Sequence, residues 1–202
     1  MNDLLPRGVE VPGGFETVGT IAHLNLSEEQ MSYRKVIGQV ILDKNAMLST
    51  VVSKIGQIES TYRFYDLVCI AGESSSYETI HVEDKVRFKV DISRVYWCSK
   101  LSSERNRVIS ELLKPTDVLC DMFCGVGPLA VKAAVKLPKL RVLANDLNPV
   151  AFEYLEKNIK LNKIGNRVVP FNMDARAYLR MLVDKDDQRE EKQRVPAEML
   201  KF

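Results

Sequence analysis

The stretch Thr116-Asp-Val-Leu-Cys-Asp-Met-Phe-Cys-Gly-Val-Gly-Pro-Leu-Ala130 decides the fold of this 202-residue chain. Its apolar run, Val118 to Cys120, predicts a buried strand that ends on a carboxylate, Asp121. A turn with two glycines, Gly125 and Gly127, follows, and a proline then suits the first position of an apolar helix. Strand, glycine turn and helix together predict the first unit of a nucleotide-binding α/β sheet.

The residues after this unit continue the alternation of helices and strands. Helices are predicted at 128–137, 150–161 and 176–182, and further strands at 141–144 and 168–171. Such alternation predicts a parallel sheet with right-handed crossovers. We therefore expect a partial Rossmann-like domain over residues 96–183, and a charged, disordered tail over residues 184–202.

Residues 1–95 predict a separate, smaller α+β module. Ser27 and Gln30 have the spacing of a capping box, and apolar residues at helical spacing behind them predict a helix over about 28–42. Four β-rich runs follow, at 50–58, 62–71, 77–82 and 86–92, separated by clusters of Gly, Ser, Asp or Glu. The fold class expected is thus α/β, with a small α+β module ahead of the sheet.

The composition excludes several classes of protein. The 29 Lys and Arg nearly balance the 27 Asp and Glu, so no basic arm is indicated. The four cysteines form no CxxC pair, which argues against a metal site and against a disulfide framework. No apolar run is long enough to span a membrane. We expect neither a metal nor a membrane as a partner.

An aspartate follows each of the three predicted strands: Asp121, Asp146 and Asp174. Each aspartate alone is more simply explained as a helix cap or a turn residue. Ligands of open α/β sheets bind beyond the carboxyl ends of the strands, however, and three aspartates there together with the glycine turn favour a ligand site. The Gly-x-Gly-x-x-Ala pattern is also compatible with an NAD-dependent dehydrogenase. A carboxylate directly before the turn would repel a pyrophosphate and attract a cation, which favours S-adenosylmethionine. Asp146 would then accept from ribose hydroxyls, and Asp174 would reach the adenine amino group.

The junction between the two predicted domains is rich in groups able to do chemistry. Ser102 or Ser103 is expected to cap a helix that runs to about Lys114. Glu104 would lie in the first turn of that helix, where its simplest role is to complement the helix dipole.

Three strings make a family resemblance specific. Asp121-Met-Phe-Cys-Gly-Val-Gly-Pro128, Asn145-Asp-Leu-Asn-Pro149 and Asn158-Ile-Lys-Leu-Asn-Lys163 resemble the eukaryotic and archaeal tRNA (guanine-37 N1)-methyltransferases. Upstream strings such as Ile37-Gly-Gln-Val-Ile-Leu-Asp-Lys44 and Val95-Tyr-Trp97 extend the resemblance from Asn2 to about Leu182. The family's relatives, the wybutosine-pathway aminocarboxypropyl transferases, use the same cofactor, but the proline after the second glycine favours the methyltransferase.

The resemblance implies S-adenosylmethionine as cofactor, the anticodon stem-loop of tRNA as partner, and a class I methyltransferase sheet. By similarity Glu104 is the general base, Arg63 stabilises charge on guanine O6, and Tyr96 packs near the target base. The positions that match the cofactor pocket are Arg105, Asp121, Phe123, Gly125, Gly127, Asp146, Leu147, Asn148, Asp174 and Ala175. The family also suggests a monomer in the cytoplasm, the nucleus or the mitochondrial matrix.

The chain departs from the family pattern at the junction and at both of its ends. Ser99 and Lys100 stand where the family has Pro-Arg, so a bidentate contact there is in doubt. The family's fourth strand, with its Asn-Leu-Pro or Asn-Pro-Pro motif, and the domain expected ahead of residue 1 are not found. We therefore expect an N- and C-terminally truncated fragment with weak or no activity. The alternatives are a non-catalytic tRNA- or nucleotide-binding fragment and an aminocarboxypropyl transferase.

Overall fold

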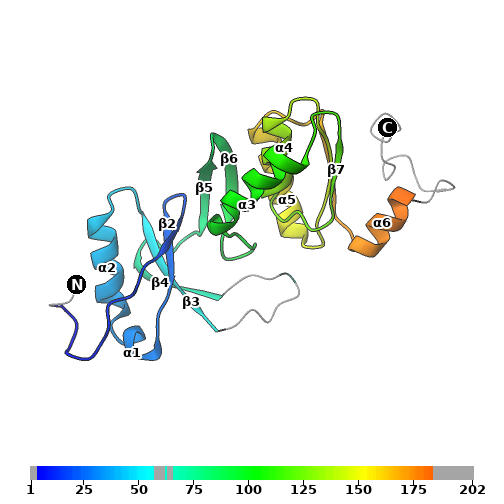
Figure 1. The fold of residues 1–202 in the computed structure, drawn as a ribbon. Coiled ribbons are helices and arrows are strands. Elements are labelled where there is room, and N and C mark those ends of the chain that lie inside the picture. Colours follow the sequence, from blue (N-terminus) through cyan, green and yellow to red (C-terminus); the bar gives the residue numbers. More distant parts are fainter. Residues whose placement is uncertain (1–3, 57–61, 63–65, 184–202) are drawn as a thin grey trace. The chain divides into compact units, whose positions relative to one another are not determined.

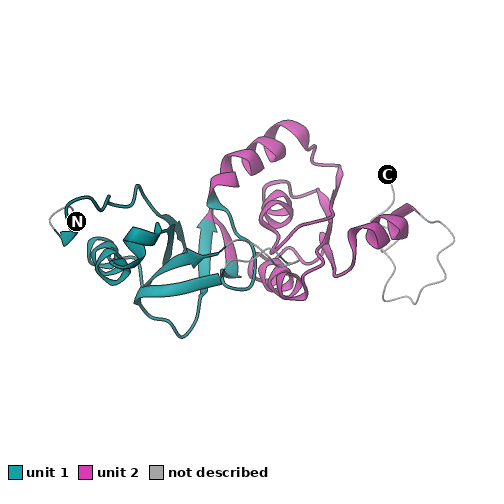
Figure 2. Ribbon diagram, turned by 90° about the horizontal axis from the view of Figure 1, so that it is seen from below, with its two compact units in different colours: residues 1–82, 89–99 teal, residues 83–88, 100–202 magenta. Residues whose placement is uncertain are grey.

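The computed structural model describes residues 4–56, 62 and 66–183, in two compact units. Unit 1 comprises residues 1–82 and 89–99, and unit 2 comprises residues 83–88 and 100–202 (Figure 2). The sequence placed the boundary at residue 95, whereas unit 1 extends to Ser99 and the segment 83–88 belongs to unit 2. The predicted tail, 184–202, and Arg63 lie outside the described residues.

Unit 1 is built on a four-stranded sheet with the strand order β1-β2-β3-β4. The strands are β1 (Glu16–Val18), β2 (Ile21–Asn25), β3 (Thr50–Ile55) and β4 (Asp66–Gly72). β2 and β3 run parallel, and the helical segment that joins them packs against the sheet (Figure 1). The core combines apolar residues of β2, β3, β4 and this helical segment: Ala22, Leu24, Ile37, Ile41, Val51 and Ile70.

The predicted helix over 28–42 forms in two pieces, α1 (Glu28–Met31) and α2 (Arg34–Lys44). The capping box is confirmed, because Ser27 and Gln30 exchange hydrogen bonds between side chain and backbone in both directions. The helix breaks at Tyr33, whose φ of −106° and ψ of 11° lie outside the helical region. The guanidinium of Arg34 then donates to the carbonyl of Met31, which the break would otherwise leave without a helical partner.

A hairpin of β5 (Glu78–Glu83) and β6 (Val86–Asp91) follows. Its two turn residues, Asp84 and Lys85, both have positive φ, 50° and 70°, as a two-residue turn of type I′ requires.

Unit 2 contains a three-stranded parallel sheet, in the order β7 (Val118–Asp121), β8 (Arg141–Asn145) and β9 (Val168–Phe171). The helices α4 (Pro128–Lys136) and α5 (Pro149–Leu161) join the strands, and α6 (Ala175–Val183) follows β9 (Figure 1). The predicted parallel α/β alternation is therefore confirmed.

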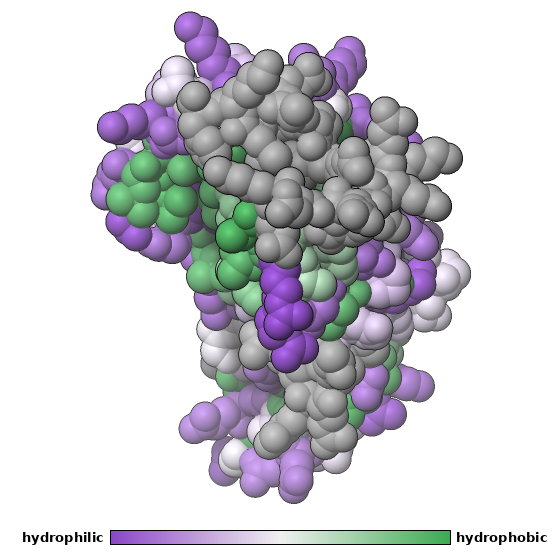
Figure 3. All heavy atoms as spheres, turned by 90° about the vertical axis from the view of Figure 1, so that its right-hand side faces the viewer, coloured by the Kyte–Doolittle hydropathy of each residue, from purple (hydrophilic) through white to green (hydrophobic). Residues whose placement is uncertain are grey.

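The last helix, α6, packs against the sheet through Tyr178 and Met181, which cluster with Leu143 of β8. Its amphipathic sequence also leaves Leu179 and Val183 exposed. Figure 3 shows apolar side chains gathered among polar ones on the side of the molecule where α6 lies in Figure 1.

The junction helix begins differently from the prediction. A short 3₁₀ turn, η2 (Ser99–Leu101), leads into α3 (Ser102–Arg107), and a π-helical segment, η3 (Val108–Leu112), continues it. Leu101 occupies the N-cap position and no side chain caps the helix, so the prediction that Ser102 or Ser103 caps it is wrong. The chain already turns helically before Ser102, and neither serine is therefore at the position where a cap acts.

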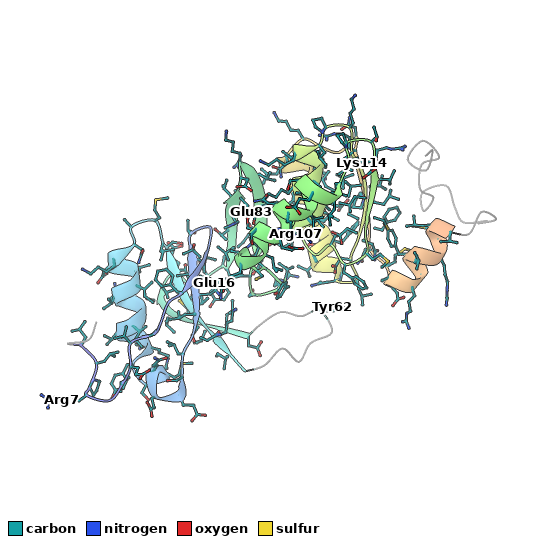
Figure 4. The ribbon with its side chains drawn as sticks, viewed as in Figure 1. Arg7, Glu16, Tyr62, Glu83, Arg107 and Lys114 are labelled. Atoms are coloured by element: carbon teal, nitrogen blue, oxygen red, sulfur yellow. The ribbon has the colours of Figure 1, made fainter. Side chains whose placement is uncertain are left out.

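A buried ionic cluster joins the hairpin turn to α3 and α4 within unit 2, around Glu83 (labelled in Figure 4). Lys132, whose side chain is fully buried, places Nζ 2.6 Å from Glu83 Oε1 and 2.7 Å from Asp84 Oδ2. The Nε of Arg105 lies 3.1 Å from the same Glu83 oxygen. Burial opposes ionisation of Glu83, but the hydrogen bonds and charges of Arg105 and Lys132 outweigh it and lower its pKa.

Replacing Glu83 by Gln is expected to lower the free energy of unfolding by about 3–5 kcal/mol, because the two buried cations would lose the carboxylate that they share, although Lys132 would keep Asp84. The control, Glu78→Gln, breaks the exposed Glu78–Lys89 pair and is expected to cost less than about 1 kcal/mol. Chemical denaturation at neutral pH measures both. Equal losses in the two variants would contradict the role of the buried cluster.

The pKa of Glu83 is lower in the folded chain than its ordinary value of 4.5. Its ionic interactions therefore contribute fully to the free energy of unfolding above pH 4.5, and this contribution is lost as the pH falls through the pKa of the folded state.

Candidate functional site

The glycine turn between β7 and α4 needs both of its glycines, for different reasons. Gly127 is the N-cap of α4 with φ of 86°, and a Cβ there would lie 2.7 Å from Leu155 and 2.8 Å from Val131. Gly125 also has positive φ, 56°, but a Cβ there would meet nothing within 4 Å. The space beside Gly125 is open, so a ligand can approach the backbone closely at this point.

Asp146 joins the end of β8 to this turn. Its Oδ2 accepts from the backbone N–H of Gly125 at 2.7 Å, and its Oδ1 accepts from that of Asn148 at 2.9 Å. Asn148 in turn caps α5 by accepting from the N–H of Val150. A carboxylate offers about four acceptor positions, so Asp146 keeps capacity for the hydroxyl groups of a ligand.

Asp121, at the end of β7, makes the site acidic. Its Oδ1 accepts from the N–H of Phe123 at 3.3 Å. Burial, together with the charge of Asp146, raises the pKa of Asp121 to about 6, although the hydrogen bond from Phe123 opposes this. A buried carboxylate with a second carboxylate beside it creates a place where a cationic ligand is stabilised and a pyrophosphate is repelled.

Asp174 follows β9 and is engaged by the start of α6. It accepts from the backbone N–H groups of Arg176 and Ala177, and its two oxygens lie 3.0 Å from the Arg176 guanidinium. Hydrogen bonds from Arg176 lower the pKa of Asp174 to about 2. Its described contacts are those of a helix cap at Ala175, and its reach towards an adenine stays a prediction.

One side chain that the sequence reasoning missed, Asn145, ties the ends of all three strands together. It is fully buried at the end of β8. Its amide donates to the carbonyls of Met122 and Met173 and accepts from the N–H of Met173, with distances of 3.0–3.1 Å. The signal available in the sequence was a polar residue directly after the apolar run Val142 to Ala144, since a buried amide must find several partners.

Two exposed apolar side chains border this site. Phe123 is 73% exposed and Leu147 is 44% exposed, so both can contact a ligand. The loop that carries Leu147 is held by Asn172, whose amide donates to the carbonyls of Asp146 and Leu147. The predicted cofactor positions at the ends of β7, β8 and β9 therefore lie on one connected set of loops.

The predicted base and its neighbour lie on α3 of the same unit. Glu104 is half exposed, and Arg107 donates to both of its oxygens, at 2.7 and 2.9 Å. Those hydrogen bonds lower the pKa of Glu104. Arg105, predicted to line the cofactor pocket, is buried against Glu83. Tyr96 belongs to unit 1 and is 43% exposed.

Within residues 4–56, 62 and 66–183, no cluster of three or more His, Cys, Asp or Glu is arranged to hold a metal ion. No helix of this described part is long and apolar enough to cross a membrane.

Comparison with known protein families gives two matches. The TRM5/TYW2 methyltransferase domain matches residues 79–189, and the TYW2 N-terminal domain matches residues 2–75. A curated tRNA (guanine(37)-N(1))-methyltransferase of Phytophthora infestans is 45% identical over 188 residues, which are 93% of this chain and 45% of that protein. The enzyme of that name from Xenopus tropicalis is 46% identical, over 91% of this chain and 36% of its own length. The chain thus spans less than half of these relatives.

Solved structures agree with the sequence comparison. Trm5b from Pyrococcus abyssi is similar with a TM-score of 0.73 and 41% identity, over 82% of this chain and 48% of that protein. The structure of the complex of aTrm5 with tRNALeu is similar with a TM-score of 0.74 and 34% identity, over the same shares of the two chains. TYW2 of P. horikoshii in complex with MeSAdo is similar with a TM-score of 0.70 and 29% identity, over 87% of this chain and 61% of that one. The expected fold class, a Rossmann-like methyltransferase sheet preceded by a small α+β module, is confirmed.

The acidity of the site has a cost in stability that can be measured. The folded-state pKa of Asp121 is raised, so ionisation destabilises the ligand-free chain as the pH rises from about 4 through about 6. Asp121→Asn is expected to stabilise it at neutral pH by up to about 3 kcal/mol while weakening the binding of S-adenosylmethionine. Thermal unfolding at pH 5 and pH 7.5, with calorimetric titration, measures both effects.

The matched variant is Asp146→Asn. Its side-chain NH₂ group would face one of the two backbone N–H groups, of Gly125 and Asn148, that donate to Asp146. This variant is expected to destabilise the chain by about 1–3 kcal/mol. If Asp121→Asn also lowered stability at neutral pH, the charge repulsion inferred for the site would be wrong.

Proposed function

Because the chain belongs to the TRM5/TYW2 methyltransferase family, we propose that it forms the cofactor-binding and catalytic part of an enzyme that methylates N1 of guanine-37 in tRNA. The observation that carries the proposal is the acidic site beside the open backbone of Gly125, at the ends of three parallel strands. The curated relatives that cover the same residues are named for this reaction.

The residues of this site fit S-adenosylmethionine. The cofactor is cationic, and the carboxylates of Asp121 and Asp146 favour a positive group over the phosphates of a dinucleotide. The remaining acceptor positions of Asp146 suit ribose hydroxyls, and the exposed ring of Phe123 and side chain of Leu147 offer apolar contacts. When bound, S-adenosylmethionine supplies an electrophilic methyl group.

The target nitrogen carries a proton that must leave, and Glu104 is the proposed acceptor. Its lowered pKa keeps it ionised at neutral pH, as a base must be. The same hydrogen bonds from Arg107 reduce its basicity, so the substrate has to loosen this pair before Glu104 accepts the proton. Arg63 and Tyr96 are assigned to guanine O6 and to the guanine ring from the family resemblance.

A second candidate reaction is transfer of the aminocarboxypropyl group from the same cofactor. It is favoured by the match of residues 2–75 to the TYW2 N-terminal domain and by the likeness to TYW2 of P. horikoshii. Pro128, after the second glycine, favours methyl transfer. Mass spectrometry of the nucleosides from the reacted tRNA distinguishes the two products directly.

Cofactor selectivity is the first test. Calorimetry is expected to detect binding of S-adenosylhomocysteine, whose ammonium group and ribose suit the acidic site, and no binding of NAD, whose pyrophosphate the site repels. The reverse result would support a dehydrogenase instead.

The proposed base is tested by Glu104→Gln in single-turnover methyl transfer with the chain in excess over unmodified guanine-37 tRNA. Transfer is expected to fall by about 10²–10⁴-fold, because glutamine cannot accept the proton. The matched control is Glu111→Gln, since Glu111 is the other carboxylate beside Arg107, 3.7 Å away. That variant is expected to retain transfer.

Binding of S-adenosylhomocysteine should be the same in both variants and in the unchanged chain. Undiminished transfer by Glu104→Gln would show that another group is the base. Binding of cofactor and tRNA without any transfer by the unchanged chain would favour the non-catalytic alternative.

A further inference from the structure

The cations of unit 2 include two groups that differ in their partners. Those of the first group are neutralised by carboxylates: Lys132 and Arg105 by Glu83, Arg107 by Glu104, and Arg176 by Asp174. Those of the second group, the four-cation surface, are Lys85, Arg87, Lys160 and Lys163. These four are exposed, and in the part of the chain that the structure describes no carboxylate forms an ion pair with them.

One two-point contact brings the four cations together. The side chain of Asn162, at the end of α5, donates to the carbonyl of Arg87 at 2.7 Å and accepts from its N–H at 3.1 Å. Lys163 is the next residue after Asn162, and Lys160 and Lys85 are each two residues from one of the paired residues. Because consecutive Cα atoms are about 3.8 Å apart, each backbone position lies within about 8 Å of this contact.

Two of these lysines occupy positions where folding alone favours glycine. Lys85 is the second residue of the hairpin turn, with φ of 70°, and Lys163 follows the C-cap of α5, with φ of 57°. Glycine is the preferred residue at both kinds of position, because a Cβ strains the left-handed conformation. The presence of lysine at both therefore calls for a reason outside folding.

The surface lies far from the acidic site. α5 starts beside Asp146, at Asn148, and has 13 residues, so Asn162 is about 20 Å away along the helix axis. A ligand that reaches both places must be an extended molecule, and a single nucleotide is too short.

We propose that the four-cation surface contacts phosphates of the tRNA backbone away from the target guanine. The proposal rests on the proposed function, because it takes tRNA as the partner. Unpaired lysine and arginine side chains release counterions from nucleic acid when they meet phosphates, and they position the RNA without reading its sequence. The surface contributes affinity for tRNA, and the site near Gly125 contributes the chemistry.

The test uses Lys85→Gly, Lys163→Gly and the double variant, with filter binding of unmodified tRNA from 50 to 200 mM salt. Each lysine removed is expected to reduce the slope of log affinity against log salt by about one, and affinity at 0.1 M salt by roughly fivefold to eightfold. The melting temperature should stay the same or rise, since glycine relieves the positive φ. Loss of affinity together with retained stability identifies a functional lysine.

Two control variants accompany these. Lys163→Arg keeps the charge and should keep the slope. Arg180→Gln removes an exposed charge from α6 and should leave the slope unchanged. Calorimetry with S-adenosylhomocysteine, expected to be equal for all variants, checks the site at the other end of α5.

If the slope of log affinity against log salt is unchanged in the double variant, the four-cation surface does not bind tRNA. Retained guanine-37 methylation would then leave the proposed function intact. A slope that falls equally in Arg180→Gln also overturns the four-cation surface. A lower slope in the lysine variants, with no methyl product even from the unchanged chain, supports the surface and rejects the proposed function. Absence of any tRNA binding by the unchanged chain overturns both.

Discussion

The site depends on one pair of neighbouring side chains at the end of β8. Asn145 is fully buried and joins the loops that follow β7 and β9, while Asp146 holds the amide of Gly125. These contacts hold the backbone at Gly125, at Met122 next to Asp121, and at Asn148 where α5 begins. Because a buried amide without partners is costly, the three loops have one mutually consistent arrangement.

Unit 2 contains two buried carboxylates whose surroundings differ in the part of the chain that the structure describes: Glu83 is paired with cations, and Asp121 is not. Around Glu83 two cations satisfy one carboxylate, and the cluster stabilises the packing of α3 and α4. Around Asp121 burial and, to a smaller extent, a second carboxylate raise the pKa of Asp121, and the described residues form no ion pair with it. A structural ion cluster and a ligand site therefore differ in whether the protein itself supplies the counter-charge. The second arrangement stores unfavourable energy that a cationic ligand can release.

Local rules predicted the elements whose signals lie within a few residues. The strand before Asp121, the proline-initiated α4 and the capping box at Ser27 were all found where the sequence placed them. The failures lie at one helix break and one helix start, for which the sequence contained no capping or breaking signal. These are the break at Tyr33 and the 3₁₀ entry into α3, which displaced the cap expected at Ser102 or Ser103.

The sequence alone determined the α/β alternation, the family and the three strand-end aspartates, because these depend on spacing along the chain. Only the tertiary structure decided what those charges do. Asp146 holds a glycine amide, Asp174 holds Arg176, and Asp121 is left with a raised pKa. Glu83 and Lys132, 49 positions apart, gave no local signal of their pairing. Charge interactions depend on distance and burial in space, and the linear sequence does not contain either directly.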